Sequence, residues 1–354
     1  MKYANWNVPE RGAEIPRALL AAGCTPLLAA ILHLRGLSDP AAARSFLRGG
    51  AETLTNPLEL TGMVDAVQRL TRAVATGEHV AVYGDYDVDG ITAACLLTDY
   101  LRFRGLTCEL YIPDRIRDGY GLNTAAIDAL AEEGVTLIVT VDCGVTNLEE
   151  TAYAAQRGVD MIVTDHHECR EALPEAEAVV DPKQPDSSGV GTALAGVGVA
   201  FKLVCAMDGD ADKMLARYGD LVAVGTVADV MPLVGENRTL VKAGLRQLQQ
   251  TDRPGFMALL KEVGLAGKPV TAENVSYAIA PRINAAGRMD SAVTALQLVL
   301  CEDEDRAAEL AHRLTEINVS RQETEQEIVK AAQELLDREP GLLEDRVILL
   351  WGQN

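Results

Sequence analysis

Between residues 80 and 180 the chain alternates short apolar runs with segments long enough to form helices. The apolar runs are rich in β-branched residues and span residues 80–83, 108–112, 137–141, 161–164 and 178–180. Helix-length segments lie between them, at 91–103, 124–133 and 148–157. This alternation predicts a parallel sheet flanked by helices, an α/β fold. Ligands of such sheets bind beyond the carboxyl ends of the strands, so the residues after each run are the candidates for chemistry.

Helical patterns flank this region, and they predict a chain of four parts. In chain order these are an N-terminal helical cap, the α/β domain, a helical extension and the start of a truncated C-terminal domain, at 1–75, 76–235, 236–340 and 341–354. The extension ends in a long connecting helix at 304–338, whose apolar seam is interrupted at Arg321 and Thr324. That imperfect seam favours a helix packed on a neighbouring domain over a coiled coil. Beyond it, the apolar run 346–351 predicts a strand.

Composition narrows the class of protein. The 354 residues carry 32 Lys and Arg against 52 Asp and Glu, a formal net charge of −20. Proteins that coat duplex DNA are usually basic, so this charge argues against that class, but an enzyme can still meet phosphate through bound metal ions. The seven cysteines are widely spaced and form no CxxC pair, which fits a reducing cytosol and argues against a zinc ribbon. Without a secretory leader or a long apolar stretch, we expect a cytoplasmic protein with no membrane partner.

Acidic and histidine side chains follow the predicted strands and one further apolar segment at 221–227. In chain order they are Asp85, Asp87 and Asp89, then Asp142, then Asp165-His166-His167, and finally Asp229. Two divalent cations need hard carboxylate oxygens, one or two imidazoles and a carboxylate that can bridge. Bound cations would also offset the mutual repulsion of the carboxylates. The pattern therefore predicts a two-metal site at one edge of the sheet.

Simpler roles account for only part of this acidic and histidine set. The segment 85–90 resembles the start of an EF-hand loop, but a strand precedes it and the glutamate of that loop is missing. Asp89 could cap the following helix, and His166-His167 could be a buried structural pair. Neither role explains three carboxylates within five residues together with the other strand ends.

Glycine-rich segments give weaker signals. Segments 113–121 and 281–288 place Arg beside Gly, where guanidinium and backbone could together hold phosphate. An ordinary surface loop with ion pairs explains each of them about as well. The run Gly196-Val-Gly198 lacks the third glycine of a dinucleotide-binding motif and predicts close helix packing or a turn. The sequence contains no GxxxxGK(S/T) motif, which excludes a P-loop.

With these residues in hand, the sequence resembles the DHH phosphoesterase superfamily and, within it, the bacterial RecJ family of single-strand-specific DNA exonucleases. The general motifs are Asp85-Tyr-Asp87-Val-Asp89-Gly90, Val141-Asp142-Cys-Gly144, Asp165-His-His167 and Gly225-Thr-Val-Ala-Asp229-Val-Met-Pro-Leu233. Two motifs resemble RecJ more specifically, namely Tyr120-Gly-Leu-Asn123 and Pro281-Arg-Ile-Asn-Ala-Ala-Gly-Arg-Met289. The resemblance covers residues 50–354, and it departs at the end because the family's DHH-associated and OB-like domains are absent here.

The resemblance implies an activity and a role for each matching residue. The activity is a metal-dependent 5′→3′ exonuclease on single-stranded DNA, in DNA repair and recombination, with two Mn²⁺ or Mg²⁺ ions and with a single-strand-binding protein and a helicase as partners. The implied metal ligands are Asp85, Asp87, Asp89, Asp142, His166 and Asp229. Asp142 would bridge the metals and share the catalytic role with His167, which would lie near the scissile phosphate. The implied DNA contacts are Arg115, Tyr120, Arg282 and Arg288.

Three alternatives stay open at this point. The segment around Asp87 and Asp89 also resembles the nucleophile motif of haloacid-dehalogenase-like phosphatases, whose chemistry does not need the DHH motif. A DHH-type phosphodiesterase acting on short oligonucleotides or cyclic dinucleotides is disfavoured by the RecJ-like Arg and Gly segments. A non-catalytic DHH-like scaffold would have lost metal ligands, and none is missing from the sequence.

Overall fold

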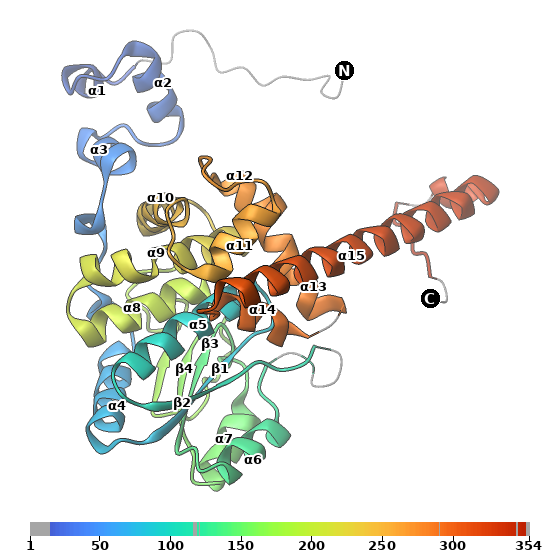
Figure 1. The fold of residues 1–354 in the computed structure, drawn as a ribbon. Helices are drawn as coiled ribbons and strands as arrows, with labels where there is room; N and C mark the ends of the chain where they lie inside the picture. Colours follow the sequence, from blue (N-terminus) through green and yellow to red (C-terminus); the bar gives the residue numbers. More distant parts are fainter. Residues whose placement is uncertain (1–14, 116–118, 120, 290, 345, 352–354) are drawn as a thin grey trace.

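A five-stranded sheet lies at the centre of the computed structural model, which describes residues 15–115, 119, 121–289, 291–344 and 346–351. Its strands run parallel in the order β2-β1-β3-β4-β5 (Figure 1). The strands are β1 (His79–Gly84), β2 (Thr107–Tyr111), β3 (Leu137–Val141), β4 (Asp160–Thr164) and β5 (Ala178–Val180). The predicted α/β fold and its five strands are confirmed.

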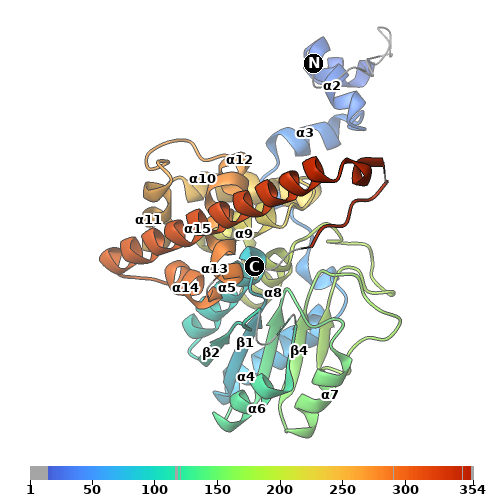
Figure 2. The same cartoon turned by 90° about the vertical axis from the view of Figure 1, so that its right-hand side faces the viewer.

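Helices cover both faces of this sheet (Figures 1 and 2). Along β1, Val80 and Val82 pack into one hydrophobic layer, whereas Ala81 and Tyr83 pack into the other. The first layer contains α4 (Met63–Thr76), α5 (Val88–Phe103) and α8 (Gly196–Asp208), and the second contains α6 (Thr124–Glu132) and α7 (Leu148–Gln156). Because both faces are buried, the strands are almost continuously apolar.

The remaining elements are helical. On the C-terminal side they are α9 (Ala211–Ala228), α10 (Gly235–Leu248), α11 (Pro254–Glu262), α12 (Ala272–Asn274), the π-helical turn η3 (Val275–Ile279), α13 (Ala280–Met289), α14 (Ala292–Val299), α15 (Glu304–Arg338) and η4 (Pro340–Glu344). On the N-terminal side they are α1 (Arg17–Ala21), α2 (Pro26–Leu34), α3 (Pro40–Arg48), η1 (Ala51–Thr53) and η2 (Pro57–Glu59). Within the described ranges, no helix has both the length and the apolar composition needed to cross a bilayer.

The N-terminal helices have a small core of their own and are tied to α10. Leu19 and Leu32 lie buried in this core, which is separate from the main one. Arg238 of α10 donates to the carbonyl oxygen of Phe46 at 2.7 Å, and Lys242 donates to that of Leu47 at 3.0 Å. Cationic side chains thus satisfy carbonyl groups at the end of α3, which fixes its junction with the body.

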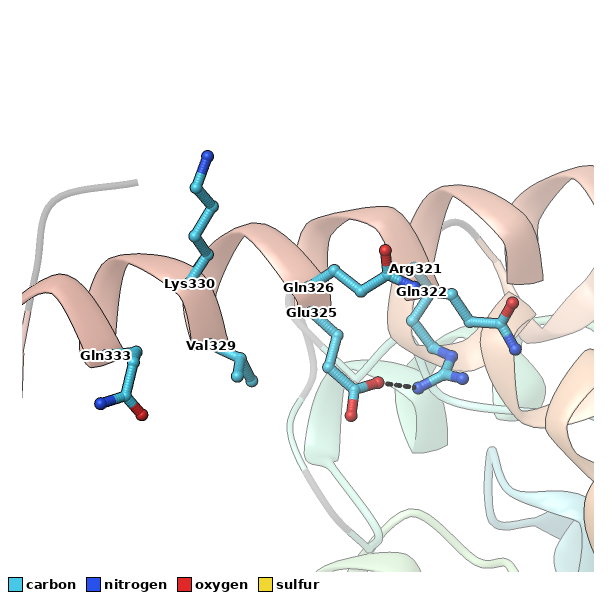
Figure 3. Close-up of a pocket in the computed structure, with 7 residues that line it drawn as sticks. All are labelled: Arg321, Gln322, Glu325, Gln326, Val329, Lys330 and Gln333. Carbon is cyan, nitrogen blue, oxygen red and sulfur yellow. Dashed lines mark hydrogen bonds and ion pairs between the residues drawn. The ribbon is translucent and has the colours of Figure 1, made fainter.

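The long helix α15 has the predicted bounds, and its two halves differ in burial. Its first half packs against α11, α13 and α14 through buried residues such as Leu310 and Leu314. Its second half projects from the body (Figure 1), and there Ile328 is 61 % exposed. Residues 321–333 of that half line an open pocket of about 700 Å³. Figure 3 shows these side chains and the ion pair of Arg321 with Glu325, whose charged atoms lie 2.9 Å apart.

The strand predicted at 346–351 is wrong. These residues form a bend followed by irregular chain, and Val347, Leu349 and Trp351 are largely exposed. A strand needs a neighbouring strand to satisfy its N–H and C=O groups. In the described part of the chain the sheet ends at β2 and β5, and neither edge pairs with this segment.

The register of the sheet aligns the residues that follow its strands. Gly84 pairs with Val141, Val141 with Thr164, and Thr164 with Val180. The next residue of each strand is an aspartate, so four carboxylates stand in one row at the carboxyl edge: Asp85, Asp142, Asp165 and Asp181. The order of the strands reverses between β1 and β3, which is where open α/β sheets bind ligands.

Candidate metal centre

The turn after β1 carries three carboxylates into the helix α5. Asp87 is the N-cap of α5, since its Oδ1 accepts hydrogen bonds from the backbone N–H of Asp89 at 2.9 Å and of Gly90 at 3.1 Å. The helix therefore begins two residues earlier than a cap at Asp89 would place it. A Cβ at Gly90 would lie 2.5 Å from the carbonyl oxygen of Asp85, so only glycine allows this turn.

Asp89 is fixed by the N-terminus of α8. Its Oδ2 accepts from the N–H of Gly196 at 2.6 Å, and its Oδ1 accepts from the N–H of Val197 at 3.0 Å. A Cβ at Gly196 would lie 2.5 Å from Cβ of Asp142, so the predicted close helix packing at this glycine is confirmed. Two N–H groups that have no partner within their own helix thus hold the carboxylate of Asp89, which is 1 % exposed.

His166 stands among three carboxylates from three different elements. Its Nε2 lies 3.0 Å from Oδ1 of Asp142, 3.7 Å from Oδ2 of Asp229 and 3.8 Å from Oδ2 of Asp89. Asp142 adopts a left-handed backbone with φ 60°, a conformation that aspartate tolerates better than most residues. The fold therefore gathers side chains from the ends of β3, β4, α9 and the start of α5 around one imidazole.

The side chains fall into three groups, and within each group the potential ligand atoms lie within 4.8 Å of one another. These groups are Asp85 with Asp87 and Asp142, Asp89 with His166 and Asp229, and Asp142 with His166 and His167. Asp142 and His166 each belong to two groups, and of these two only the carboxylate of Asp142, with two oxygens, can bridge adjacent cations. All six residues expected as metal ligands are thus brought together, and their roles as ligands stay a prediction.

The donor atoms fit cations because several of them have no other partner. Among the described residues, Asp85 Oδ1, Asp142 Oδ1 and both ring nitrogens of His166 are buried without a partner in hydrogen-bond geometry. Leaving such atoms unsatisfied costs about 1–3 kcal/mol each. Carboxylate oxygens with a histidine nitrogen form the donor set of Mn²⁺ and Mg²⁺ sites, and manganese accepts imidazole more readily.

Burial raises the pKa values of the candidate carboxylates, which a bound cation would lower again, and it lowers the pKa of the histidine among them. Burial, then the charge of Asp87, raises the pKa of Asp85 to about 7. The same two causes raise the pKa of Asp229 to about 6. Burial, then the neighbouring His167, lowers the pKa of His166 to about 4. A divalent ion would favour the ionised carboxylates, and the neutral imidazole that burial favours is the form that can coordinate it.

His167 is held by the first residue of its own motif. Its Nδ1 lies 2.7 Å from Oδ1 of Asp165, which also accepts from the backbone N–H of His166 at 2.8 Å. The other oxygen, Oδ2, accepts from the N–H of Val145 at 3.0 Å. The hydrogen bond that His167 donates to Asp165 raises the pKa of His167. Sequence reasoning gave Asp165 no role, although a carboxylate beside a functional histidine commonly orients it.

The expected DNA contacts have different surroundings. Arg115 is exposed and its guanidinium lies 5.2 Å from the centre of the Tyr86 ring. Arg288 is exposed and lines a pocket of about 200 Å³ with Asn284 and Arg321. Asn284 also accepts the N–H of Val88 at 3.1 Å, which joins α13 to the start of α5.

Arg282 and Tyr120 differ from these two. The guanidinium of Arg282 donates to Thr315 Oγ1 at 3.1 Å and to the carbonyl oxygen of Ala278 at 2.7 Å, so it ties α13 to α15. Tyr120 lies outside the described residues. A role in DNA binding stays a prediction for all four residues.

Known proteins share both the sequence and the fold of this chain. The model of the DHH family, N-terminal domain, matches residues 79–226. The single-stranded-DNA-specific exonuclease RecJ of Bacillus subtilis strain 168 is 38 % identical over 326 residues, which cover 92 % of this chain and 41 % of that protein. The chain thus spans less than half the length of this relative.

Two solved structures show the same relationship. The crystal structure of RecJ in complex with Mn²⁺ from Thermus thermophilus matches with TM-score 0.76 and 33 % identity, over 90 % of this chain and 46 % of that one. A crystal structure of exonuclease RecJ bound to manganese matches with TM-score 0.70 and 37 % identity, over 77 % of this chain and 69 % of that one. Sequence identity and fold agree in these comparisons, and the chain belongs to the RecJ family of DHH proteins.

Proposed function

We propose that this chain binds two Mn²⁺ or Mg²⁺ ions and hydrolyses phosphodiester bonds of single-stranded DNA, as a 5′→3′ exonuclease of DNA repair and recombination. The observation that carries the proposal is the convergence of Asp85, Asp87, Asp89, Asp142, His166 and Asp229, several of whose buried oxygen and nitrogen atoms make no hydrogen bond. RecJ relatives named as single-stranded-DNA-specific exonucleases support it. We place the hydrolytic site in the domain 76–235. The predicted helical cap 1–75 precedes this domain, and the extension 236–340 and the segment 341–354 follow it.

Each role follows from the contacts of the residue. Two cations at this site would supply an activated water and neutralise the charge that develops on the phosphate. Asp142 is the shared ligand, because it belongs to two of the candidate groups. The N–H groups of α8 hold Asp89 in one orientation, so the carboxylate loses little freedom on binding a cation.

His167 would act on the substrate rather than chiefly on the metals. Its Nδ1 is engaged by Asp165, and the raised pKa favours the protonated ring. A protonated imidazole donates a charge-assisted hydrogen bond to a phosphate oxygen. Arg115 and Arg288, both exposed, would hold the backbone of the strand, and contacts of this kind carry no sequence information.

A nuclease assay tests the proposal. End-labelled single-stranded and blunt duplex DNA are incubated with the chain in Mn²⁺, in Mg²⁺ and in excess EDTA, and the label position reports polarity. We expect digestion of the single strand with either cation and none in EDTA. Asp142→Asn should remove activity, whereas the control Asp128→Asn, at a partly exposed aspartate of α6 that pairs with Arg157, should not. Full activity in EDTA, or faster digestion of duplex, would contradict the proposal.

The family resemblance also suggests where the protein acts and which proteins it binds. We propose a cytoplasmic location, supported by seven cysteines of which none forms a disulfide. A single-strand-binding protein and a helicase are the partners that the family resemblance implies. Pull-down of the purified chain with each purified candidate would test these partners one at a time.

A further inference from the structure

A lysine outside the recognised motifs stands next to the candidate metal centre. Lys183 follows β5 in a turn that starts at Asp181, a carboxylate only 1 % exposed. Oδ1 of Asp181 accepts the backbone N–H of Lys183 at 2.8 Å. Gln184 closes the turn, since its side-chain amide donates to the carbonyl oxygen of Val179 at 2.8 Å. The backbone that carries Lys183 is thus fixed by side chains on both sides of it.

The register of the sheet places this turn beside the DHH motif. Val180 pairs with Thr164, and its carbonyl oxygen accepts the N–H of Asp165 at 3.1 Å. The segments that follow β4 and β5 therefore leave the sheet edge side by side. An ion pair joins these two segments, since Nζ of Lys183 lies 3.1 Å from Oε1 of Glu168. Glu168 lies two residues beyond His166. The lysine is therefore anchored in the same edge of the sheet as the candidate ligands.

Electrostatic effects agree with this placement. The pKa of Asp229 is raised by burial and by Asp87, while the charges of His167 and Lys183 act in the opposite direction. The pKa of His166 is lowered by burial first, and Lys183 contributes to that lowering. These directions agree with a place for Lys183 on the same side of the sheet edge as His166, which follows β4, and Asp229, which follows α9.

The present partner of Lys183 holds it weakly. The side chain of Glu168 is 86 % exposed and that of Lys183 is 27 % exposed. An ion pair with an exposed partner contributes about 0–1 kcal/mol to stability. Exchange of Glu168 for another anion would therefore cost little. A phosphate suits this exchange, because a lysine ammonium is a compact charge with three rotatable donors.

The negative charge of the chain makes the position of the Lys183 ammonium important for a polyanionic substrate. The chain has a net charge of −20, and the metal centre is lined by carboxylates, so a polyanion is repelled over most of the approach. A cation at the rim of the site offsets that repulsion where the strand must come closest. Unlike the guanidinium of arginine, the ammonium of a lysine lacks the planar, two-pronged set of donors that suits base edges. A backbone phosphate is therefore its favoured ligand.

We propose that Lys183 binds a backbone phosphate of the single strand beside the metal centre, and that Glu168 is the partner it leaves when the strand arrives. The inference deepens the proposed function and rests on it. It adds a substrate-positioning residue that none of the recognised motifs contains.

The chain offers a matched control for this ion pair. Lys213 pairs with Asp208 at the same distance, 3.1 Å. It lies near the start of α9, whereas Asp229 caps the other end of this helix, about 24 Å away along the helix axis. Lys213→Gln and Asp208→Asn therefore change the charge as Lys183→Gln and Glu168→Gln do, but far from the site.

The experiment measures binding without cleavage. A fluorescein-labelled oligothymidylate is titrated with the unaltered chain and the four variants in Ca²⁺, by anisotropy, over a series of KCl concentrations. Thermal unfolding of each variant checks that it is folded. For Lys183→Gln, the slope of log K against log[KCl] should become less negative by about 0.7, the value for one phosphate contact on a single strand. Glu168→Gln should lower the dissociation constant, because it frees the lysine, and both control variants should keep the slope of the unaltered chain.

Two results would overturn the inference alone. If Lys183→Gln keeps the slope of the unaltered chain, or if Lys183→Gln and Glu168→Gln weaken binding equally, the ion pair is structural. Failure of the unaltered chain to bind the oligothymidylate at any salt concentration would overturn the proposed function together with this inference. The two failures are therefore distinguishable.

Discussion

His167 Nδ1 and Asp165 Oδ1 lie 2.7 Å apart, so the aspartate that opens the DHH motif orients the second histidine. The same carboxylate receives backbone N–H groups from His166 and Val145, which fixes it from both sides. Asp165 is 1 % exposed, whereas the side chain of His167 is 45 % exposed. The motif thus combines a buried positioning carboxylate, a buried histidine among other carboxylates, and a half-buried histidine that can meet a substrate.

Asp165→Asn should lower turnover by about 10–100-fold, the usual effect of losing a carboxylate that orients a functional histidine. The amide keeps the size of the side chain but loses its charge, so the pKa of His167 falls toward its ordinary value. Single-turnover rates with Mn²⁺ measure the effect, and the pH profile should shift to lower pH with the pKa of His167. An unchanged pH profile would show that Asp165 is only structural.

His166→Ala and His167→Ala should have different effects. Nε2 of His166 lies within 3.8 Å of three carboxylates, so its loss should weaken Mn²⁺ binding. His167 is already engaged by Asp165, so its loss should lower turnover and leave Mn²⁺ affinity nearly intact. Calorimetric titration of both variants with Mn²⁺ decides between these roles. Equal loss of Mn²⁺ affinity in the two variants would contradict the assignment.

The fold was accessible from the sequence because its signals are local. Each strand is an apolar run with Gly, Asp or a helix-length segment after it, and parallel strands put their ends at one edge. That rule alone places Asp85, Asp142 and His166 near one another, whereas Asp229 caps the helix α9 and reaches the site through the packing of that helix. A strand at 346–351 was predicted from the same kind of run and is wrong, because apolar composition cannot supply the neighbouring strand that such a run requires.

The parts of the site that were missed depend on register. Asp181 follows the short strand β5 as Asp165 follows β4, and it could have been found by applying the strand-end rule once more. Lys183 could not, because its place follows from the turn and from its pairing with Glu168. The cap of α5 is Asp87, and the spacing of the aspartates alone did not distinguish it from Asp89. Long-range hydrogen bonds such as that from Gly196 to Asp89 leave no local trace in a sequence.

The ion cluster around Arg69 should make stability depend on acid. Arg69, only 6 % exposed, donates to both oxygens of Glu78, and this hydrogen bonding lowers the pKa of Glu78. A carboxyl group with a lowered folded-state pKa stabilises the fold above its unfolded pKa, and that stabilisation is lost as the pH falls through the folded-state value. Glu78→Gln should therefore cost about 2 kcal/mol of unfolding free energy near neutral pH.

The cost of Glu78→Gln should shrink as both proteins are brought to acid. Urea unfolding at about pH 7 and at about pH 3.5, on either side of the ordinary glutamate pKa, measures the difference. Glu309→Gln is the control, since that glutamate pairs with Arg306 on the surface of α15 and is 69 % exposed. The control should change stability little at either pH. A cost for Glu78→Gln that is the same at both pH values would contradict the electrostatic origin.

Val230→Gly should raise the free energy of unfolding by about 1 kcal/mol, because Val230 is a β-branched residue in a left-handed backbone, with φ 58°. It follows α9, where its N–H donates to the carbonyl oxygen of Val227 and that of Met231 donates to Thr226, the hydrogen bonds of a helix end that favours glycine. Its side chain is 84 % exposed, so the substitution removes little packing. Val319→Gly, at an exposed valine inside α15, should instead lower stability by about the same amount. Urea unfolding of both variants tests the difference in sign, and a loss of stability in Val230→Gly would show that the isopropyl group stabilises the fold in spite of the strain.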